Sequence, residues 1–168
     1  SPPSPAAILQ FMDNQPPICV IGGGLGGAEA AWQLARRGLA CTLFEMRPVK
    51  RTEAHQSPHL AEIVCSNSLK SDRPGTPQGL LKEELRALGS FVLACAEQTR
   101  IPAGEALAVD RDAFARLVTE RIEGEALIEL RREEVTALPG EGLAVVASGP
   151  LTSGSLAAAL AGAAGEKN

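Results

Sequence analysis

The hydrophobic pattern of the chain begins with a short apolar run at residues 18–21, which enters a cluster of glycines. From Leu25 to Arg37 the apolar residues recur at spacings of three and four, which is typical of one face of an α-helix. Gly38 is expected to end this helix, because glycine tolerates the positive φ that often follows a helix C-terminus. A second apolar run lies at residues 40–45. A strand, a helix and a second strand in this order predict a right-handed parallel β-α-β unit.

The periodicity lapses over residues 46–78, where four prolines interrupt the chain. Structureless loops of this length are uncommon, so we expect an irregular functional segment that holds some short elements. In residues 79–88 the leucines are expected to form the buried face of an amphipathic helix, whereas residues 91–98 fit a helix or a buried strand. The remaining pattern predicts a helix at 111–123, a helix from Thr152 or Ser153 to about Ala164, and strands at 106–109, 126–130, 135–138 and 143–147.

This order of elements predicts an α/β protein, namely a Rossmann-like domain with a parallel sheet, flanking helices and a small β meander. The chain has 168 residues, of which 45% are hydrophobic, and its mean hydropathy is +0.03, as expected for one globular domain. We expect a flexible proline-rich leader at residues 1–16 and a single domain at residues 17–168. No run approaches the ~20 apolar residues that span a bilayer, so we expect no membrane partner and a cytoplasmic location.

Charge and cysteine content exclude some classes of function. The net charge of −4 argues against non-specific nucleic-acid binding by the whole domain. Residues 46–86 carry more Lys and Arg than Asp and Glu, which fits either a solvated surface or a region that faces a phosphate-bearing partner. The four cysteines form no C-x-x-C pair, so neither a metal site nor a redox dithiol is expected. Cys19 and Cys41 fall in predicted strands, where cysteine acts as a small apolar residue.

The glycine cluster carries the strongest candidate chemistry. Gly22, Gly24 and Gly27 fit G-x-G-x-x-G, in which the glycines allow a tight turn, close approach of a pyrophosphate and close packing of helix on strand. Glu45 ends the second apolar run 23 residues after Gly22, where a carboxylate can accept hydrogen bonds from a ribose diol. Arg47 follows closely and fits either a contact with the cofactor or a solvated side chain. The sequence therefore predicts a dinucleotide site, whose physics serves NAD and FAD equally.

Several stretches together resemble the TrmFO family of folate- and FAD-dependent tRNA (uracil-5-)-methyltransferases. The glycine loop and the Phe-Glu-Met-Arg-Pro sequence at residues 44–48 would also fit the related MnmG flavoproteins, which modify the tRNA wobble uridine. The Cys-Ser-Asn-Ser-Leu sequence at 65–69 and the Ala-Val-Asp-Arg sequence at 108–111 favour TrmFO. Other matching stretches are 22–32, 61–64, 79–84, 101–104 and 148–153. The similarity covers about residues 18–156.

The resemblance implies a flavoenzyme that transfers a methylene group from methylenetetrahydrofolate, reduces it with electrons from NAD(P)H through FAD, and leaves a methyl group on C5 of a T-loop uridine of tRNA. Cys65 matches a family cysteine proposed as the nucleophile, although a buried structural cysteine is the alternative. Its neighbours Ser66, Asn67 and Ser68 match groups that bind flavin or substrate, or else cap a turn. The further cofactor-binding residues that the resemblance and the glycine motif imply are Gly22, Gly23, Gly24, Leu25, Gly26, Gly27, Glu45, Met46, Arg47 and Gly149.

The histidines and the length of the chain qualify this interpretation. His55 and His59 precede Cys65, and an imidazolium there would lower the pKa of the thiol; two surface histidines are the simpler account. Family members extend well beyond 168 residues, so we expect this chain to be an incomplete FAD-binding portion whose C-terminal part is missing, with weak FAD binding and no methyl transfer of its own. An MnmG-like tRNA modifier, a nucleotide-binding module without catalysis, and a plain flavin or NAD oxidoreductase remain as alternatives.

Overall fold

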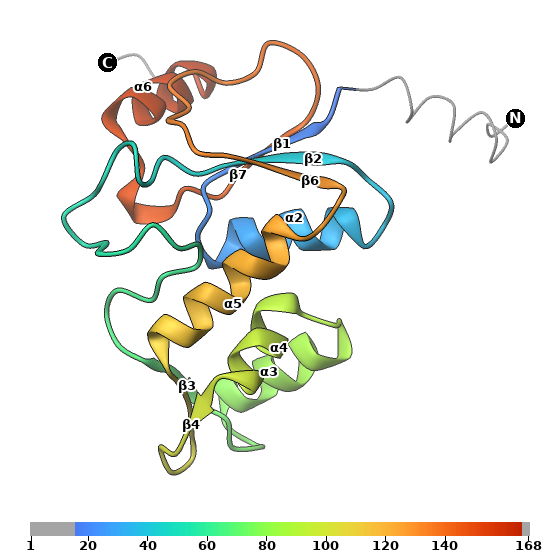
Figure 1. Cartoon of the computed structure of the whole chain (residues 1–168), viewed down its shortest axis with the longest axis vertical. Helices are drawn as coiled ribbons and strands as arrows, with labels where there is room; N and C mark the ends of the chain where they lie inside the picture. Colours follow the sequence, from blue (N-terminus) through green and yellow to red (C-terminus); the bar gives the residue numbers. More distant parts are fainter. Residues whose placement is uncertain (1–15, 166–168) are drawn as a thin grey trace, which may run out of the picture.

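The centre of the molecule is a four-stranded parallel β-sheet. The computed structural model describes residues 16–165; residues 1–15, which hold nearly all of the expected leader, and residues 166–168 lie outside the described part. The strand order is β6-β2-β1-β7, and every neighbouring pair is parallel. The strands are β1 (Ile18–Ile21), β2 (Cys41–Phe44), β6 (Ile128–Arg131) and β7 (Ala144–Val146). This sheet and its flanking helices confirm the predicted α/β Rossmann-like class (Figure 1).

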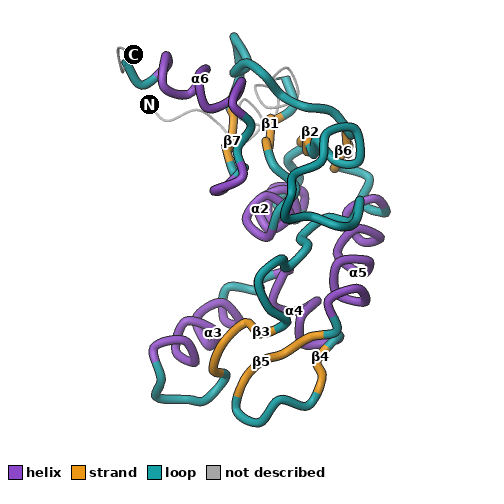
Figure 2. Tube along the Cα trace, turned by 90° about the vertical axis from the view of Figure 1, so that its left-hand side faces the viewer, coloured by secondary structure: helices purple, strands orange, loops and turns teal. Residues whose placement is uncertain are grey.

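Helices cover one face of the sheet and form the core with it. In both views α2 (Leu25–Ala35) and α5 (Arg111–Glu123) lie on one side of the sheet, whereas α6 (Gly154–Ala163) lies on the other side (Figures 1 and 2). Helix α2 presents alanines to β1 and β2, which allows a close approach of helix and sheet. Helix α4 (Phe91–Gln98) packs between α2 and α5, so the predicted helix at 91–98 is confirmed and the alternative strand is excluded.

A smaller antiparallel sheet lies at the far end of the molecule from the parallel sheet (Figure 2). Its strands are β3 (Ser68–Ser71), β4 (Arg100–Ile101) and β5 (Ala106–Val109), in the order β3-β5-β4. Helix α3 (Pro77–Ala87) packs beside β3 and α4. Within the described residues, 45–67 form no helix or strand, and the single turn of 3-10 helix η1 (Gly149–Leu151) precedes α6.

Two sequence predictions are wrong. Val135–Leu138 is not a strand: β6 and β7 occupy opposite edges of the sheet, and these residues belong to the connection that crosses between them. Helix α3 forms as predicted, but only part of its leucine face meets the core: Leu85 packs against it, whereas Leu80 and Leu81 are both 54% exposed. Lys82 is buried instead, because its ammonium reaches inward and donates to the carbonyl of Ser71 at 2.9 Å.

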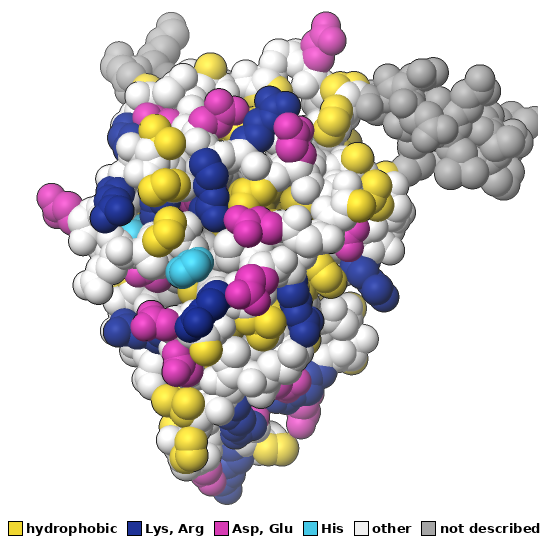
Figure 3. All heavy atoms as spheres, in the orientation of Figure 1, with side chains coloured by type: hydrophobic (Ala, Val, Ile, Leu, Met, Phe, Trp, Pro, Cys, Tyr) yellow, Lys and Arg dark blue, Asp and Glu magenta, His cyan; other side chains and the backbone are white. Residues whose placement is uncertain are grey.

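The surface in Figure 3 carries interspersed cationic and anionic side chains, and neither sign dominates that face. Some charged side chains form ion pairs between distant segments; for example, Nζ of Lys50 lies 2.7 Å from Oε1 of Glu134. Among residues 16–165 no helix is both long and apolar enough to cross a membrane.

Candidate dinucleotide-binding site

A cavity of about 320 Å³ opens at the carboxyl ends of β1, β2 and β7. Ligands of open parallel sheets bind at this edge, because the loops that leave the strands converge there. The glycine loop, the end of β2, the β6–β7 connection and the turn after β7 supply most of its lining: residues 21–26, 44–47, 133–135 and 147–153, with His55, Glu62, Val64 and Leu156. The structure therefore gathers segments that are more than 100 residues apart in the sequence.

The glycines of the loop differ in whether the fold leaves room for a side chain. A side chain at Gly22, whose φ is +105°, would place its Cβ 2.7 Å from Cα of Ser148. At Gly27 the Cβ would lie only 1.7 Å from the carbonyl oxygen of Gly22, so α2 packs directly on the turn that precedes it. At Gly24, in contrast, a Cβ would meet no atom of the chain within 4 Å. Gly22 and Gly27 thus serve the fold, whereas Gly24 keeps open the space in front of the helix.

The N-terminus of α2 is suited to an anion. Gly24 is the N-cap residue, so no side chain satisfies the backbone N–H groups of the first turn. No acidic residue lies in that first turn either. Unsatisfied N–H groups and the helix dipole favour a negative charge at this position. A pyrophosphate fits both the chemistry of the helix end and the open space at Gly24.

Glu45 is fixed by hydrogen bonds from the glycine loop and from Arg47. Its carboxylate accepts a hydrogen bond from the N–H of Gly23 at 3.0 Å and another from Nε of Arg47 at 2.9 Å. The backbone N–H of Arg47 also donates to this carboxylate at 3.0 Å. Burial alone would raise the pKa of Glu45, but these hydrogen bonds and the guanidinium outweigh it and lower the pKa. Glu45 is therefore an ionised acceptor at the wall of the cavity.

Arg47 is buried and joins two carboxylates. Only 2% of its surface is exposed, and its Nη1 donates to Oε2 of Glu62 at 3.0 Å while its other nitrogens bind Glu45. Glu62 in turn accepts hydrogen bonds from the N–H and the hydroxyl of Ser57 at 3.1 and 2.9 Å. Burial would raise the pKa of Glu62, but these hydrogen bonds and Arg47 lower it. The interpretation of Arg47 as a solvated side chain is wrong, because the Glu45–Arg47–Glu62 cluster connects β2 to the irregular segment.

Residues 60 and 61 of the irregular segment contact the glycine loop directly. The N–H of Ala61 donates to the carbonyl of Gly23 at 2.8 Å, and the N–H of Leu60 donates to the hydroxyl of Thr119 in α5 at 2.8 Å. Leu60 is fully buried, and a Cβ at Gly23 would lie 2.5 Å from its side chain. Residues 60–62 therefore hold both the loop and Glu45 in place.

On the opposite wall, Gly149 begins the turn after β7 with a φ of +64°, and its carbonyl accepts a hydrogen bond from the hydroxyl of Thr152 at 2.6 Å. Gly23, Leu25, Gly26 and Met46 also line the cavity. His55 lies on its wall, where burial and the charge of Arg47 lower its pKa. The structure brings these predicted residues together around one site.

The Cys-Ser-Asn-Ser stretch lies elsewhere. Cys65, Ser66 and Asn67 are exposed, and Ser68 is half-buried at the start of β3. None of the four is among the residues that line the cavity, whereas Val64, immediately before them, is. In the described part of the chain Cys65 is therefore separate from the glycine loop and is not a buried structural cysteine.

Several residues around the cavity belong to no motif that the sequence reveals. Glu62 binds Arg47, and Glu133, Glu134 and Val135 line the cavity from the β6–β7 connection. Arg132, from the same connection, donates to the carbonyl of Pro58 at 2.6 Å. No spacing rule identifies them, because each comes from an irregular segment whose path depends on tertiary contacts.

The strand order, the glycine turn and the fixed acidic residue define a Rossmann-like dinucleotide-binding domain. Residues 17–161 match the family described as "Glucose inhibited division protein A", and the chain belongs to this family. The structure of Aquifex aeolicus GidA (form II crystal) superimposes with a TM-score of 0.59 over 75% of this chain and 21% of that chain, at 21% identity, which supports the shared fold.

Curated relatives are closer in sequence. The methylenetetrahydrofolate--tRNA-(uracil-5-)-methyltransferase TrmFO of Solibacter usitatus is 63% identical over 145 residues, which are 86% of this chain and 33% of that protein. The TrmFO of Pelotomaculum thermopropionicum is 58% identical over 89% of this chain and 34% of that protein. The resemblance to TrmFO is therefore confirmed. The chain spans about one third of the length of these relatives.

Proposed function

We propose that this chain is the FAD-binding portion of a methylenetetrahydrofolate-dependent tRNA uridine C5-methyltransferase, acting on a T-loop uridine. The observation that carries the proposal is the open space at Gly24 between an uncapped helix N-terminus and the fixed carboxylate of Glu45. These groups suit the pyrophosphate and a ribose diol of FAD respectively. The identity of 56–63% to proteins named TrmFO favours this activity over that of other flavoproteins with the same fold.

In this proposal the residues of the cavity bind and orient the cofactor. The backbone from Gly22 to Gly27 receives the pyrophosphate, Glu45 accepts hydrogen bonds from the ribose hydroxyls, and Arg47 keeps Glu45 ionised and directed toward Gly23. Met46 and Gly149 line the walls beside them. FAD, when bound, would pass electrons from NAD(P)H to the methylene group that methylenetetrahydrofolate supplies.

Cys65 is proposed as the nucleophile toward uracil in the complete enzyme. A thiolate that adds to C6 of the ring makes C5 nucleophilic, and only an accessible cysteine can reach an RNA base. Cys65 is exposed, as this role requires. Ser66, Asn67 and Ser68 offer hydroxyl and amide groups next to it for flavin or substrate. Because Cys65 lies outside the cavity, we expect no methyl transfer by this chain alone.

Titration of the purified chain with FAD, followed by flavin fluorescence, tests the proposal. We expect saturable binding of FAD, competition by ADP, and no binding of FMN at the same concentration, because the groups on the cavity wall recognise the adenosine diphosphate half. Binding of FMN equal to that of FAD, or no binding of FAD by the folded chain, would contradict the proposal. In a full-length relative, Cys65→Ala at the matching position should abolish methyl transfer to tRNA while FAD remains bound; retained transfer would favour an MnmG-like role.

A further inference from the structure

A second cavity, of about 350 Å³, lies where α2, α3, α4 and α5 meet. It is at the C-terminal end of α2, the end opposite to the glycine loop. Its lining includes two aromatic rings, three guanidinium groups and one carboxylate: Trp32, Phe91, Arg36, Arg86, Arg121 and Glu97. None of these residues takes part in the candidate dinucleotide site.

Trp32 is half-buried and can offer one ring face to a ligand, whereas Phe91 is only 2% exposed and supports the Trp32 ring from the core. Trp32 and Phe91 stack with their centroids 4.3 Å apart and their planes inclined by 14°. Glu29 fixes the backbone under this pair, because its carboxylate accepts hydrogen bonds from the N–H groups of Phe91 and Val92 at 3.0 and 2.8 Å. The hydroxyl of Ser90 donates to the same carboxylate at 2.8 Å. The surface is ordered before any ligand arrives, which lowers the entropy cost of binding.

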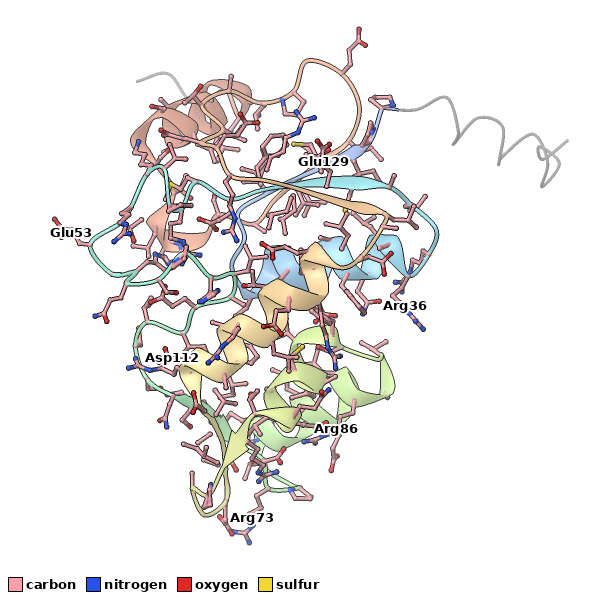
Figure 4. The ribbon with its side chains drawn as sticks, viewed as in Figure 1. Arg36, Glu53, Arg73, Arg86, Asp112 and Glu129 are labelled. Atoms are coloured by element: carbon pink, nitrogen blue, oxygen red, sulfur yellow. The ribbon has the colours of Figure 1, made fainter. Side chains whose placement is uncertain are left out.

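The rim of this cavity is cationic although the chain as a whole carries a net charge of −4. Arg86 is already engaged by Asp72 and Glu97, each at 2.6 Å. Arg121 makes one side-chain hydrogen bond, from Nη2 to Gln98 at 2.8 Å. Arg36, seen on the same side of the molecule as Arg86 in Figure 4, donates no side-chain hydrogen bond to any residue of the described range 16–165. Two guanidinium groups therefore keep donors for an anionic ligand.

We propose that this cavity binds a nucleotide unit, with its base against Trp32, which Phe91 supports from the core, and its phosphate at Arg36 and Arg121. Aromatic faces stack bases of any sequence, and guanidinium groups bind phosphate through paired hydrogen bonds. A free nucleotide and a nucleotide within single-stranded RNA offer the same two groups, so either source fits this chemistry. The inference does not depend on FAD binding, because the two cavities lie at opposite ends of α2.

Trp32 provides a direct readout, because it is the one tryptophan of the chain. Its fluorescence should be followed while the chain is titrated with uridine monophosphate and, separately, with a short single-stranded oligouridylate. We expect saturable quenching that weakens as salt is raised. Quenching by both ligands assigns a nucleotide site, and quenching by the oligonucleotide alone assigns an RNA contact. Absence of saturable quenching by both ligands overturns the proposal.

Arginine variants separate a specific site from general attraction to charge. Arg36→Ala and Arg121→Ala should each weaken binding about tenfold, since each removes one charge-assisted contact. Arg37→Ala is the matched control: it removes the same charge at the same end of α2, and Arg37 does not line the cavity. Circular dichroism checks that each variant is folded. An equal loss of affinity in Arg37→Ala and Arg36→Ala would overturn the proposal. FAD binding, measured by flavin fluorescence, should be unchanged in all three variants.

Discussion

The carboxylate of Glu45 accepts a hydrogen bond from the backbone N–H of Gly23 at 3.0 Å and joins the end of β2 to the glycine loop. One acidic side chain thereby fixes the turn and faces the space in which a ribose would lie. Arg47, two residues after Glu45, donates hydrogen bonds to the carboxylates of both Glu45 and Glu62. The cofactor-binding geometry of this domain therefore depends on a buried charged cluster as well as on its glycines.

Replacing Glu45 tests how much this cluster contributes to the free energy of unfolding. Glu45→Gln leaves the buried Arg47 with Glu62 as its remaining carboxylate, so we expect the free energy of unfolding to fall by about 3 kcal/mol, the lower end of the range for broken buried pairs. Urea unfolding measures the change. Glu129→Gln, at an exposed ion pair, should leave the free energy of unfolding nearly unchanged. Equal effects of the two substitutions would show that the buried cluster does not stabilise the fold.

The same cluster predicts how stability depends on pH. The pKa values of Glu45 and Glu62 are lowered in the folded chain, so the unfolded chain binds protons first as the pH falls. Their contribution is present above the unfolded carboxylate pKa of about 4.3 and is lost as the pH falls through the lower folded values. The urea midpoint should therefore be flat near neutrality and fall below about pH 4. In Glu45→Gln the urea midpoint should fall less steeply in this acid range. If the slope is unchanged, Glu45 does not contribute to the pH dependence of stability.

Two neighbouring glycines should respond in opposite ways to alanine. Gly27→Ala places a Cβ 1.7 Å from the carbonyl oxygen of Gly22, and we expect it to destabilise the chain by at least about 3 kcal/mol. Gly26→Ala meets nothing closer than 4.0 Å and should be neutral or stabilising by up to about 1 kcal/mol, since alanine favours helix. Thermal unfolding compares the two. Similar midpoints would contradict the proposed close packing of α2 on the glycine turn.

Thiol labelling distinguishes the exposed cysteine from the buried and half-buried ones. Burial raises the pKa values of Cys41 and Cys95 to about 11 and also raises the pKa of the half-buried Cys19, whereas Cys65 is exposed. A thiol reagent at mildly alkaline pH should react rapidly with Cys65 alone in the folded chain. Cys65→Ser should remove the fast phase, and urea should expose the other thiols. Fast labelling that persists in Cys65→Ser would show that another cysteine is accessible.

The sequence predicts most of the helices and strands because local chemistry sets their ends. The side chain of Asp110 accepts from the N–H of Ala113 at 2.9 Å, as its place before a helix suggests, and Ser153 caps α6 in the same way. Gly38 follows α2 with a φ of +76°. Such rules need only a few neighbouring residues, so they can be applied without knowing the rest of the fold.

Tertiary contacts decide the features that the sequence does not predict. The leucines predict an apolar stripe along α3, but the helix packs beside β3 and α4 and leaves Leu80 and Leu81 54% exposed. Val135 has the pattern of a strand, yet it belongs to the connection that crosses from β6 to β7, and it lines the cavity. Glu62 gives no signal in the sequence, because its role depends on the path of the irregular segment back to Arg47.

The affinity of a Gly24→Val variant for FAD tests whether the space in front of Gly24 holds the pyrophosphate of FAD. A Cβ at this position meets no atom of the chain within 4 Å, so we expect the free energy of unfolding to change by less than about 1 kcal/mol. Gly162→Val, in the C-terminal half of α6 at a residue that does not line the cavity, controls for added bulk. Gly24→Val should lose FAD affinity at least about tenfold, whereas Gly162→Val should retain it. Unchanged FAD affinity in a folded Gly24→Val variant would show that the pyrophosphate does not lie in front of Gly24.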